Sequence, residues 1–138
     1  MKSGPFLLDT GFLVALVNAA DPAHRACAVT WSQLAGPFLT TEGVLVEAAH
    51  LVRKNRAGFA TVWGLVRSVG TIVSSSARPR VDRAGALMTQ YADVPMDFVD
   101  ATLVALAEET GVRDVLTLDV RGFSTYRTGD GKKFKRLP

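Results

Sequence analysis

The sequence is poor in the residues that bind soft metals and form disulfides. Its 138 residues contain one cysteine, Cys27, and two histidines, His24 and His50. A single cysteine excludes an intramolecular disulfide, a redox pair of thiols and a cluster of thiolate ligands. A zinc site built from cysteine and histidine is therefore disfavoured, and a metal site in this chain has to rely on oxygen ligands.

Two other features are missing. No apolar run approaches the length of a membrane span, and Gly4, Pro5 and Asp9 interrupt the apolar segment near the start that a signal peptide would need. We therefore expect a cytoplasmic protein with no membrane partner. The sequence also has no G-x-x-x-x-G-K-[ST] loop, which disfavours a nucleoside triphosphatase.

Composition favours one compact domain, 1–138, because 48% of the residues are hydrophobic. The net charge is only +3, but the basic residues are clustered. After Asp119 the only acid is Asp130, and the basic residues are Arg121, Arg127, Lys132, Lys133, Lys135 and Arg136. Such a cluster allows contacts to the phosphates of a nucleic acid, and a solvated tail explains it equally well.

Short apolar runs alternate with amphipathic segments along the chain. The runs at 6–8, 38–40, 71–73 and 115–118 are rich in apolar and β-branched residues and predict strands. The segments between them predict helices, with a helical spacing of apolar residues. This alternation predicts an α/β fold, in which helices flank both faces of a central parallel β-sheet.

Two of the predicted strands lead into a carboxylate. Asp9 follows the run Phe6-Leu7-Leu8, and Asp119 follows the run 115–118. The carboxyl ends of parallel strands lie at one edge of the sheet, where α/β proteins bind their ligands. A charge beside such a buried run is costly unless another group compensates it.

Two predicted helices carry an acid on their apolar face. Glu47 lies three residues after Val44 and four before Leu51, and Asp100 lies three residues before Leu103. A helix of a globular protein normally exposes its acids on the opposite, polar face. The positions of Glu47 and Asp100 therefore predict a function for both side chains.

Each acid also has a purely structural explanation. Asp97 suits the N-cap of a helix, with Asp100 completing a capping box. Asp9 and Asp119 could cap the elements that follow them, and Glu47 could pair with a buried arginine. His50, close to one helical turn after Glu47, suggests a general base, but a polar-face position or a satisfied helix histidine explains it better. Each of these explanations is plausible by itself, but four independent explanations at once are less plausible than one shared cause.

A shared site explains all four acids together. Two carboxylates about 5 Å apart repel by roughly 3 kcal/mol at an effective dielectric near 20. Four of them need a cation or bound protons, and oxygen ligands alone suit Mg²⁺ or Mn²⁺. An acidic metal site beside basic residues suits phosphodiester hydrolysis.

Four segments resemble the motifs of the PIN-domain family. They are Leu8-Asp9-Thr10, Thr40-Thr41 with Val44-Leu45-Val46-Glu47, Asp100-Ala101, and Leu116-Thr117-Leu118-Asp119 with Phe123 beyond. The chain length and the segment 91–96 resemble the stand-alone VapC-type ribonuclease toxins of type II toxin–antitoxin systems. The resemblance covers nearly the whole chain.

The resemblance implies an endoribonuclease that depends on Mg²⁺ or Mn²⁺ and leaves 5′-phosphate and 3′-hydroxyl ends. It implies that Asp9, Glu47, Asp100 and Asp119 are the catalytic, metal-binding residues, with hydroxyls from Thr10 and Thr117 nearby. It also implies a homodimer, a cognate antitoxin protein, and an RNA substrate such as a loop of a tRNA or an rRNA.

Two other functions stay open at this stage. A receiver-type signalling domain also binds Mg²⁺ with strand-end acids, but it does not explain an inward-facing Glu47. A PIN-like module that binds RNA or protein without catalysis would keep the fold and would tolerate the loss of Asp9.

Overall fold

The computed structural model describes residues 1–138. The strands are β1 (Lys2–Ser3), β2 (Phe6–Leu8), β3 (Leu34–Ala35), β4 (Phe38–Thr41), β5 (Ile72–Ser74), β6 (Asp114–Leu116) and β7 (Lys135–Leu137). The helices are α1 (Thr10–Val17), α2 (His24–Ser32), α3 (Glu42–Leu51), α4 (Gly58–Ser68), α5 (Arg78–Gln90), α6 (Phe98–Thr110) and α7 (Val120–Thr125). None of the helices combines the length and apolar character that crossing a membrane requires.

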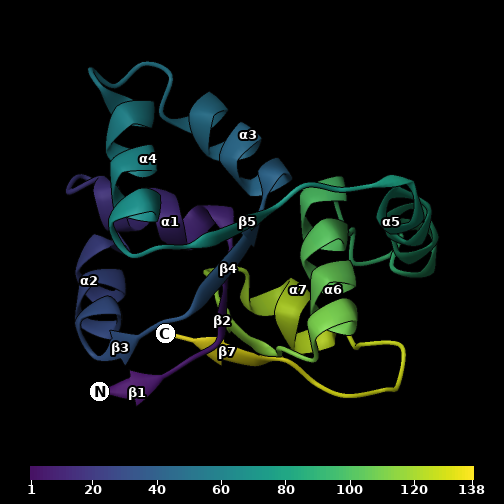
Figure 1. The fold of residues 1–138 in the computed structure, drawn as a ribbon. Coiled ribbons are helices and arrows are strands. Elements are labelled where there is room, and N and C mark those ends of the chain that lie inside the picture. Colours follow the sequence, from purple (N-terminus) through teal and green to yellow (C-terminus); the bar gives the residue numbers. More distant parts are fainter.

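Five strands form a parallel sheet in the order β5-β4-β2-β6-β7, and β1 pairs with β3 in a separate parallel ladder. Figure 1 shows α1 and α2 on one side of the strands, and α5, α6 and α7 on the other. The prediction of an α/β fold with a central parallel sheet flanked by helices is confirmed.

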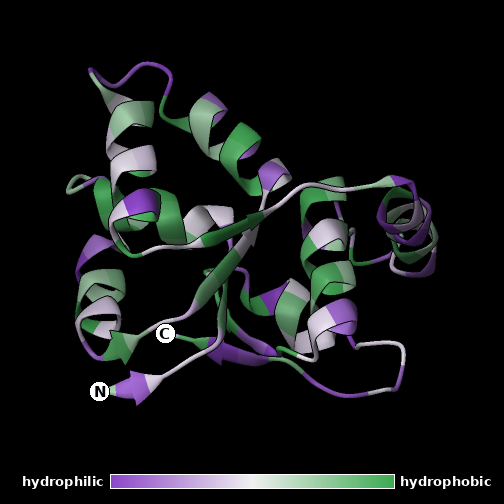
Figure 2. Cartoon of the chain, viewed as in Figure 1, coloured by the Kyte–Doolittle hydropathy of each residue, from purple (hydrophilic) through white to green (hydrophobic).

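The central strand β2 is buried on both faces. Phe6 and Leu8 belong to one core cluster, with residues of α1 and α2, while Leu7 between them belongs to the other, with residues of α3 and α6. Successive side chains of a strand point to opposite faces of the sheet, so each face of β2 is covered by helices. The central strands are also more hydrophobic than the outer ones. In Figure 2, β2 and β4 are green, whereas β1 and β7 are purple.

The chain changes direction across the sheet at β2. From β2 the chain passes through α1 to strands on one side, β4 and then β5, whereas β6 pairs on the other side of β2. This is the topological switch point at which α/β proteins form their ligand crevice. Asp9 follows β2, and Asp119 lies three residues beyond the end of β6, so the switch point brings both segments to the same edge.

Part of the basic C-terminal segment is structural. Lys135–Leu137 form β7, which pairs with β6 through the register Val115↔Arg136. Of the two explanations left open for this segment, the solvated tail is therefore wrong for these residues, because their backbone completes the sheet. Lysine and arginine on an edge strand also disfavour pairing with another chain.

The second helix begins later than its sequence suggests. The sequence Asp21-Pro22 suits an N-cap followed by the first helical position, but α2 begins at His24. Asp21 Oδ1 accepts a hydrogen bond from the Ala23 N–H at 2.8 Å, so the aspartate closes a turn before the helix. Leu34, which follows α2, is buried and lies in β3.

Glu108 links three segments around α6. The Arg83 guanidinium on α5 donates to both of its carboxylate oxygens, at 2.7 and 3.0 Å. The backbone N–H of Gly129 donates to the same carboxylate. Charge-assisted bidentate pairs of this kind are the strong ones, so Glu108 fixes α5 and the 128–131 loop to the C-terminal half of α6.

We predict that Glu108→Ala lowers the free energy of unfolding by about 2 kcal/mol, because Arg83 and the Gly129 N–H lose their acceptor. Urea unfolding measures the change. Asp82→Ala is the control, since Asp82 and Arg78 form an exposed pair at 3.9 Å and exposed pairs contribute little. Equal losses in the two variants would contradict the structural importance of Glu108.

Candidate active site

Asp9 is the most deeply placed of the four candidate acids. It follows β2, caps the N-terminus of α1 and is 6% exposed. Its Oδ1 accepts from the Thr10 N–H at 2.8 Å, and its Oδ2 accepts from the Thr117 hydroxyl at 2.5 Å. The capping explanation is therefore correct for one oxygen, while the second oxygen is held by another segment of the chain.

Thr117 connects the two strand-end acids. Its hydroxyl donates to Asp9 and accepts from the Asp119 N–H at 3.0 Å. Asp119 Oδ1 in turn caps α7 by accepting from the Gly122 N–H at 2.9 Å. A side chain on Gly122 would collide with Asp119 Oδ2, so glycine is required here for the carboxylate to keep its position.

Asp100 occupies the first turn of α6. Asp97 Oδ1 accepts from the Asp100 N–H at 2.8 Å, and Asp100 Oδ2 accepts from the Asp97 N–H at 3.5 Å. The capping box considered for this pair is thus present. The Tyr126 hydroxyl also donates to Asp100 Oδ2, at 3.2 Å, which leaves Oδ1 without a hydrogen bond.

Glu47 lies half-buried on α3 with no hydrogen bond to its carboxylate. The expected alternative, a buried arginine as its partner, is wrong, because none of the five salt bridges involves Glu47 or the other three acids. The hydroxyls of Thr41 and Thr102 lie 3.0 Å apart. This contact connects the N-cap of α3 to α6, the helix that carries Asp100.

The acids act on one another electrostatically. Burial raises the pKa of Asp9 to about 6, against the two hydrogen bonds that lower it, and the charges of Glu47 and Asp119 raise it further. Burial also raises the pKa of Asp100 to about 8, with additional contributions from Asp97, Asp9 and Asp119. All four candidate acids therefore belong to one electrostatic site.

The donor set of this site fits a hard cation. No three His, Cys, Asp or Glu side chains are placed closely enough to hold one metal ion, so the acids share an electrostatic site without forming a compact cluster of ligands. The four acids nevertheless supply only oxygen atoms, as Mg²⁺ and Mn²⁺ prefer. The buried hydroxyl of Thr10, beside Asp9, has no hydrogen-bond partner, so it is also free to bind water or a ligand.

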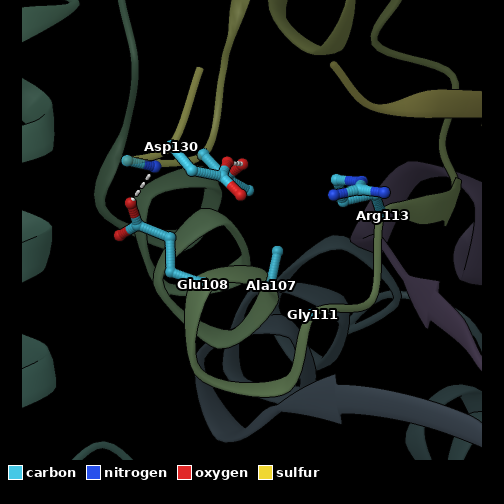
Figure 3. Close-up of a pocket in the computed structure, with 7 residues that line it drawn as sticks. Ala107, Glu108, Gly111, Arg113 and Asp130 are labelled. Carbon is cyan, nitrogen blue, oxygen red and sulfur yellow. Dashed lines mark hydrogen bonds between the residues drawn. The ribbon is translucent and has the colours of Figure 1, made fainter. Parts of the chain in front are cut away.

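None of the four acids lines any of the four pockets in the structure. Figure 3 shows a pocket of about 200 Å³ between α6 and the 128–130 loop, lined in part by Glu108, Arg113 and Asp130. Glu108 is eight residues beyond Asp100, or about 12 Å along the helix axis. The other three pockets also lack all four acids. A site outside these pockets suits a macromolecular substrate better than a small molecule.

The sequence did not predict Tyr126 as part of the site, whereas it correctly predicted that His50 is not. Tyr126 gives no sequence signal, since it lies 26 residues after Asp100 and outside the four motifs. His50 is exposed, and its carbonyl and ring contact Arg53. The interpretation of His50 as a polar-face residue is therefore confirmed.

We predict that Asp100→Asn stabilises the metal-free protein at alkaline pH. A folded-state pKa near 8, above the ordinary 3.8, means that stability from Asp100 is lost as pH rises through about 8. Asparagine stays neutral and avoids this loss. Because Asp100 is only half-buried, we expect a discounted gain of about 2 kcal/mol at pH 8.5, shrinking toward pH 4.

Urea unfolding in EDTA at pH 8.5 and pH 4.5 measures this difference. Asp93→Asn is the control, because Asp93 is exposed and its carboxylate forms no hydrogen bond or salt bridge. A parent protein as stable as the Asp100→Asn variant at pH 8.5 would contradict the prediction.

Known proteins share both the sequence pattern and this fold. The PIN-domain family model matches residues 6–128. Ribonuclease VapC26 of Mycobacterium tuberculosis is 28% identical over 135 residues, which cover 96% of this chain and 99% of that protein.

Two solved structures extend the comparison. VapC20 of M. tuberculosis, described as a toxin that cleaves the sarcin–ricin loop, superposes with a TM-score of 0.78 at 21% identity, over 89% of this chain and 97% of VapC20. VapBC2 of Rickettsia felis, bound to a DNA fragment from its promoter, superposes with a TM-score of 0.65 at 12% identity. The match covers 98% of this chain and 100% of that chain. On the family match and the shared fold, the chain belongs to the PIN-domain family and resembles its VapC-type members.

Proposed function

We propose that the protein is a metal-dependent endoribonuclease and the toxin of a toxin–antitoxin pair, acting on RNA in the cytoplasm. The observation that carries this proposal is the set of four acids at the switch point, none of which has a cationic partner. Acids with raised pKa values such as Asp9 and Asp100 are typical of functional sites.

In this proposal Asp9, Asp100 and Asp119 hold Mg²⁺ or Mn²⁺, directly or through water. The bound ion would supply Lewis-acid stabilisation of the phosphate and a more acidic water. Thr117 orients Asp9 and Asp119 through its two hydrogen bonds. Glu47 accepts no hydrogen bond, so it is available to take a proton from the attacking water.

The proposed substrate is a loop of a structured RNA, in a tRNA or an rRNA. A site that is not confined to a pocket suits a strand that continues on both sides of the scissile phosphate. Proteins read unpaired RNA best, because the bases of loops are accessible. Cleavage of the sarcin–ricin loop by VapC20 supports a loop as the substrate class.

A PIN-like module without catalysis is the main alternative. It gives no reason to keep several buried or half-buried acids together, since their mutual repulsion costs folding free energy. The receiver-type alternative is weaker still, because the chain belongs to the PIN-domain family.

We predict that the purified protein cuts RNA in Mg²⁺ and that Asp9→Asn lowers the rate by about 100-fold or more. Incubation with total cellular RNA, followed by sequencing of the 5′-phosphate ends, measures cleavage and locates the site. EDTA should abolish cleavage in the parent. Asp93→Asn is the matched control and should cut normally. Equal cutting by Asp9→Asn would remove Asp9 from the active site.

A surface on α3 and α4 is the proposed binding site for the antitoxin. Val46, Leu51, Phe59 and Trp63 are large hydrophobic residues exposed there, with Val46 66% exposed. A pocket of about 260 Å³ is lined by Leu45, Val46, Ala49 and Phe59, together with Glu42. Exposed apolar patches mark protein interaction sites.

The positive charge beside this surface favours an antitoxin segment that carries acidic side chains. Arg53, Lys54 and Arg56 follow α3 and are exposed, so a segment with apolar and acidic side chains is complementary to it. Relatives in solved structures include a toxin–antitoxin complex from Klebsiella pneumoniae. The homodimer implied by the resemblance stays a prediction.

We predict that Val46→Asp weakens binding of the cognate antitoxin at least 10-fold, because a charge then replaces an apolar contact and repels acidic residues. Isothermal titration with the cognate antitoxin measures the affinity. Val29→Asp is the control, since Val29 is 52% exposed on α2, away from this surface. Equal affinities for the parent and the Val46→Asp variant would exclude this surface.

A further inference from the structure

We propose that Tyr126 is a positioning residue of the candidate active site, whose hydroxyl fixes the Asp100 carboxylate for metal binding. The inference rests on the proposed metal site. It concerns a residue that lies outside the four sequence motifs and has no direct place in the acidic cluster. Tyr126 acts through Asp100 and does not itself touch the reacting atoms.

The contact is specific to one carboxylate oxygen. The Tyr126 hydroxyl donates to Asp100 Oδ2 at 3.2 Å, and this is the only side-chain donor to Asp100. The other donor is the Asp97 N–H, at a long 3.5 Å. Asp100 Oδ1 has no hydrogen bond. One oxygen is therefore held by the protein while the other stays available for a cation.

The surrounding aromatic rings hold the phenol ring of Tyr126 in one orientation. Tyr126 is fully buried, and its ring packs edge-on against Tyr91 and Phe123, each with a centroid distance of 5.2 Å. Phe123 packs in the same way against Phe134, at 5.3 Å. Edge-to-face pairs of this kind favour one ring orientation, so the hydroxyl has little freedom to leave Asp100.

The same residue connects two helices that carry candidate acids. The Tyr126 N–H donates to the Gly122 carbonyl at 2.8 Å and so closes α7, whose N-cap is Asp119. Its hydroxyl reaches the first turn of α6, where Asp100 lies. Tyr126 therefore fixes the position of Asp100 relative to the helix that begins at Asp119.

A structural explanation alone does not require the hydroxyl. Phenylalanine would fill nearly the same volume and would avoid burying a polar atom that needs an acceptor. The hydroxyl here meets an acid of the candidate site and not a backbone carbonyl. Burial and the charge of Asp100 raise the pKa of Tyr126, so the phenol keeps its proton and stays a donor.

The expected effect follows from how carboxylate ligands behave. Groups that hydrogen-bond to a ligating carboxylate orient it, and their removal typically lowers metal affinity or activity 10- to 100-fold. We therefore expect Tyr126→Phe to raise the dissociation constant for Mn²⁺ at least 10-fold. Cleavage should recover in part when the Mn²⁺ concentration is raised, because the acids themselves are intact.

Tyr91→Phe is the matched control. Tyr91 belongs to the same aromatic cluster, but its hydroxyl accepts from the Arg127 N–H at 2.9 Å and contacts no acid. Each variant loses one hydroxyl that forms a hydrogen bond within the protein, so both are expected to lose similar stability in EDTA by thermal unfolding. Only Tyr126→Phe should weaken Mn²⁺ binding, measured without RNA by titration calorimetry.

A double-variant cycle shows whether Tyr126 acts through Asp100. In the Asp100→Asn background, Tyr126→Phe should leave the residual Mn²⁺ affinity unchanged. Unchanged affinity in the single Tyr126→Phe variant, or an equal loss in Tyr91→Phe, would overturn the inference. A parent that binds Mn²⁺ but cuts no RNA would defeat the proposed function and leave the positioning intact, whereas a parent that binds no Mn²⁺ would defeat both.

Discussion

The burial of carboxylates at the end of β2 is the constraint on which the site depends. Asp9 is 6% exposed and has no cationic partner, so its charge is stabilised only by two hydrogen bonds. Both donors come from segments that the parallel sheet brings together, the start of α1 and the end of β6. The fold therefore offsets part of the cost, and in our proposal a bound cation relieves the remainder.

Structural and functional explanations of an acid are compatible in this protein. Asp9, Asp97 and Asp119 cap helices, and Asp100 completes a capping box. A cap uses one oxygen of a carboxylate and fixes its direction. The other oxygen is then presented in a defined orientation, which is what a metal ligand requires. Capping thus contributes to the site and does not compete with it.

Periodicity predicted most of the fold, because short apolar runs and helical stripes decide burial locally. The acids could be predicted since charge on an apolar face is anomalous, as at Glu47. The features that the sequence did not predict depend on contacts between segments far apart in the chain. Nothing local shows that Lys135–Leu137 pair with β6, or that the Tyr126 hydroxyl reaches Asp100 across 26 residues. Both depend on how distant segments pack.

The two ends of α6 show which acids the fold neutralises. Glu108 and Glu109 lie in the last turn, where a negative charge is unfavourable to the helix dipole, and each is paired with an arginine of α5. Asp100 lies in the first turn, where the dipole favours it, yet its pKa is raised by burial and by other acids. The arginines that pair with Glu108 and Glu109 lie beside the last turn of α6, about 12 Å along the helix axis from Asp100, and no salt bridge forms at Asp100. Asp100 therefore keeps the cost of its burial and of the nearby acids, which the proposed cation would relieve.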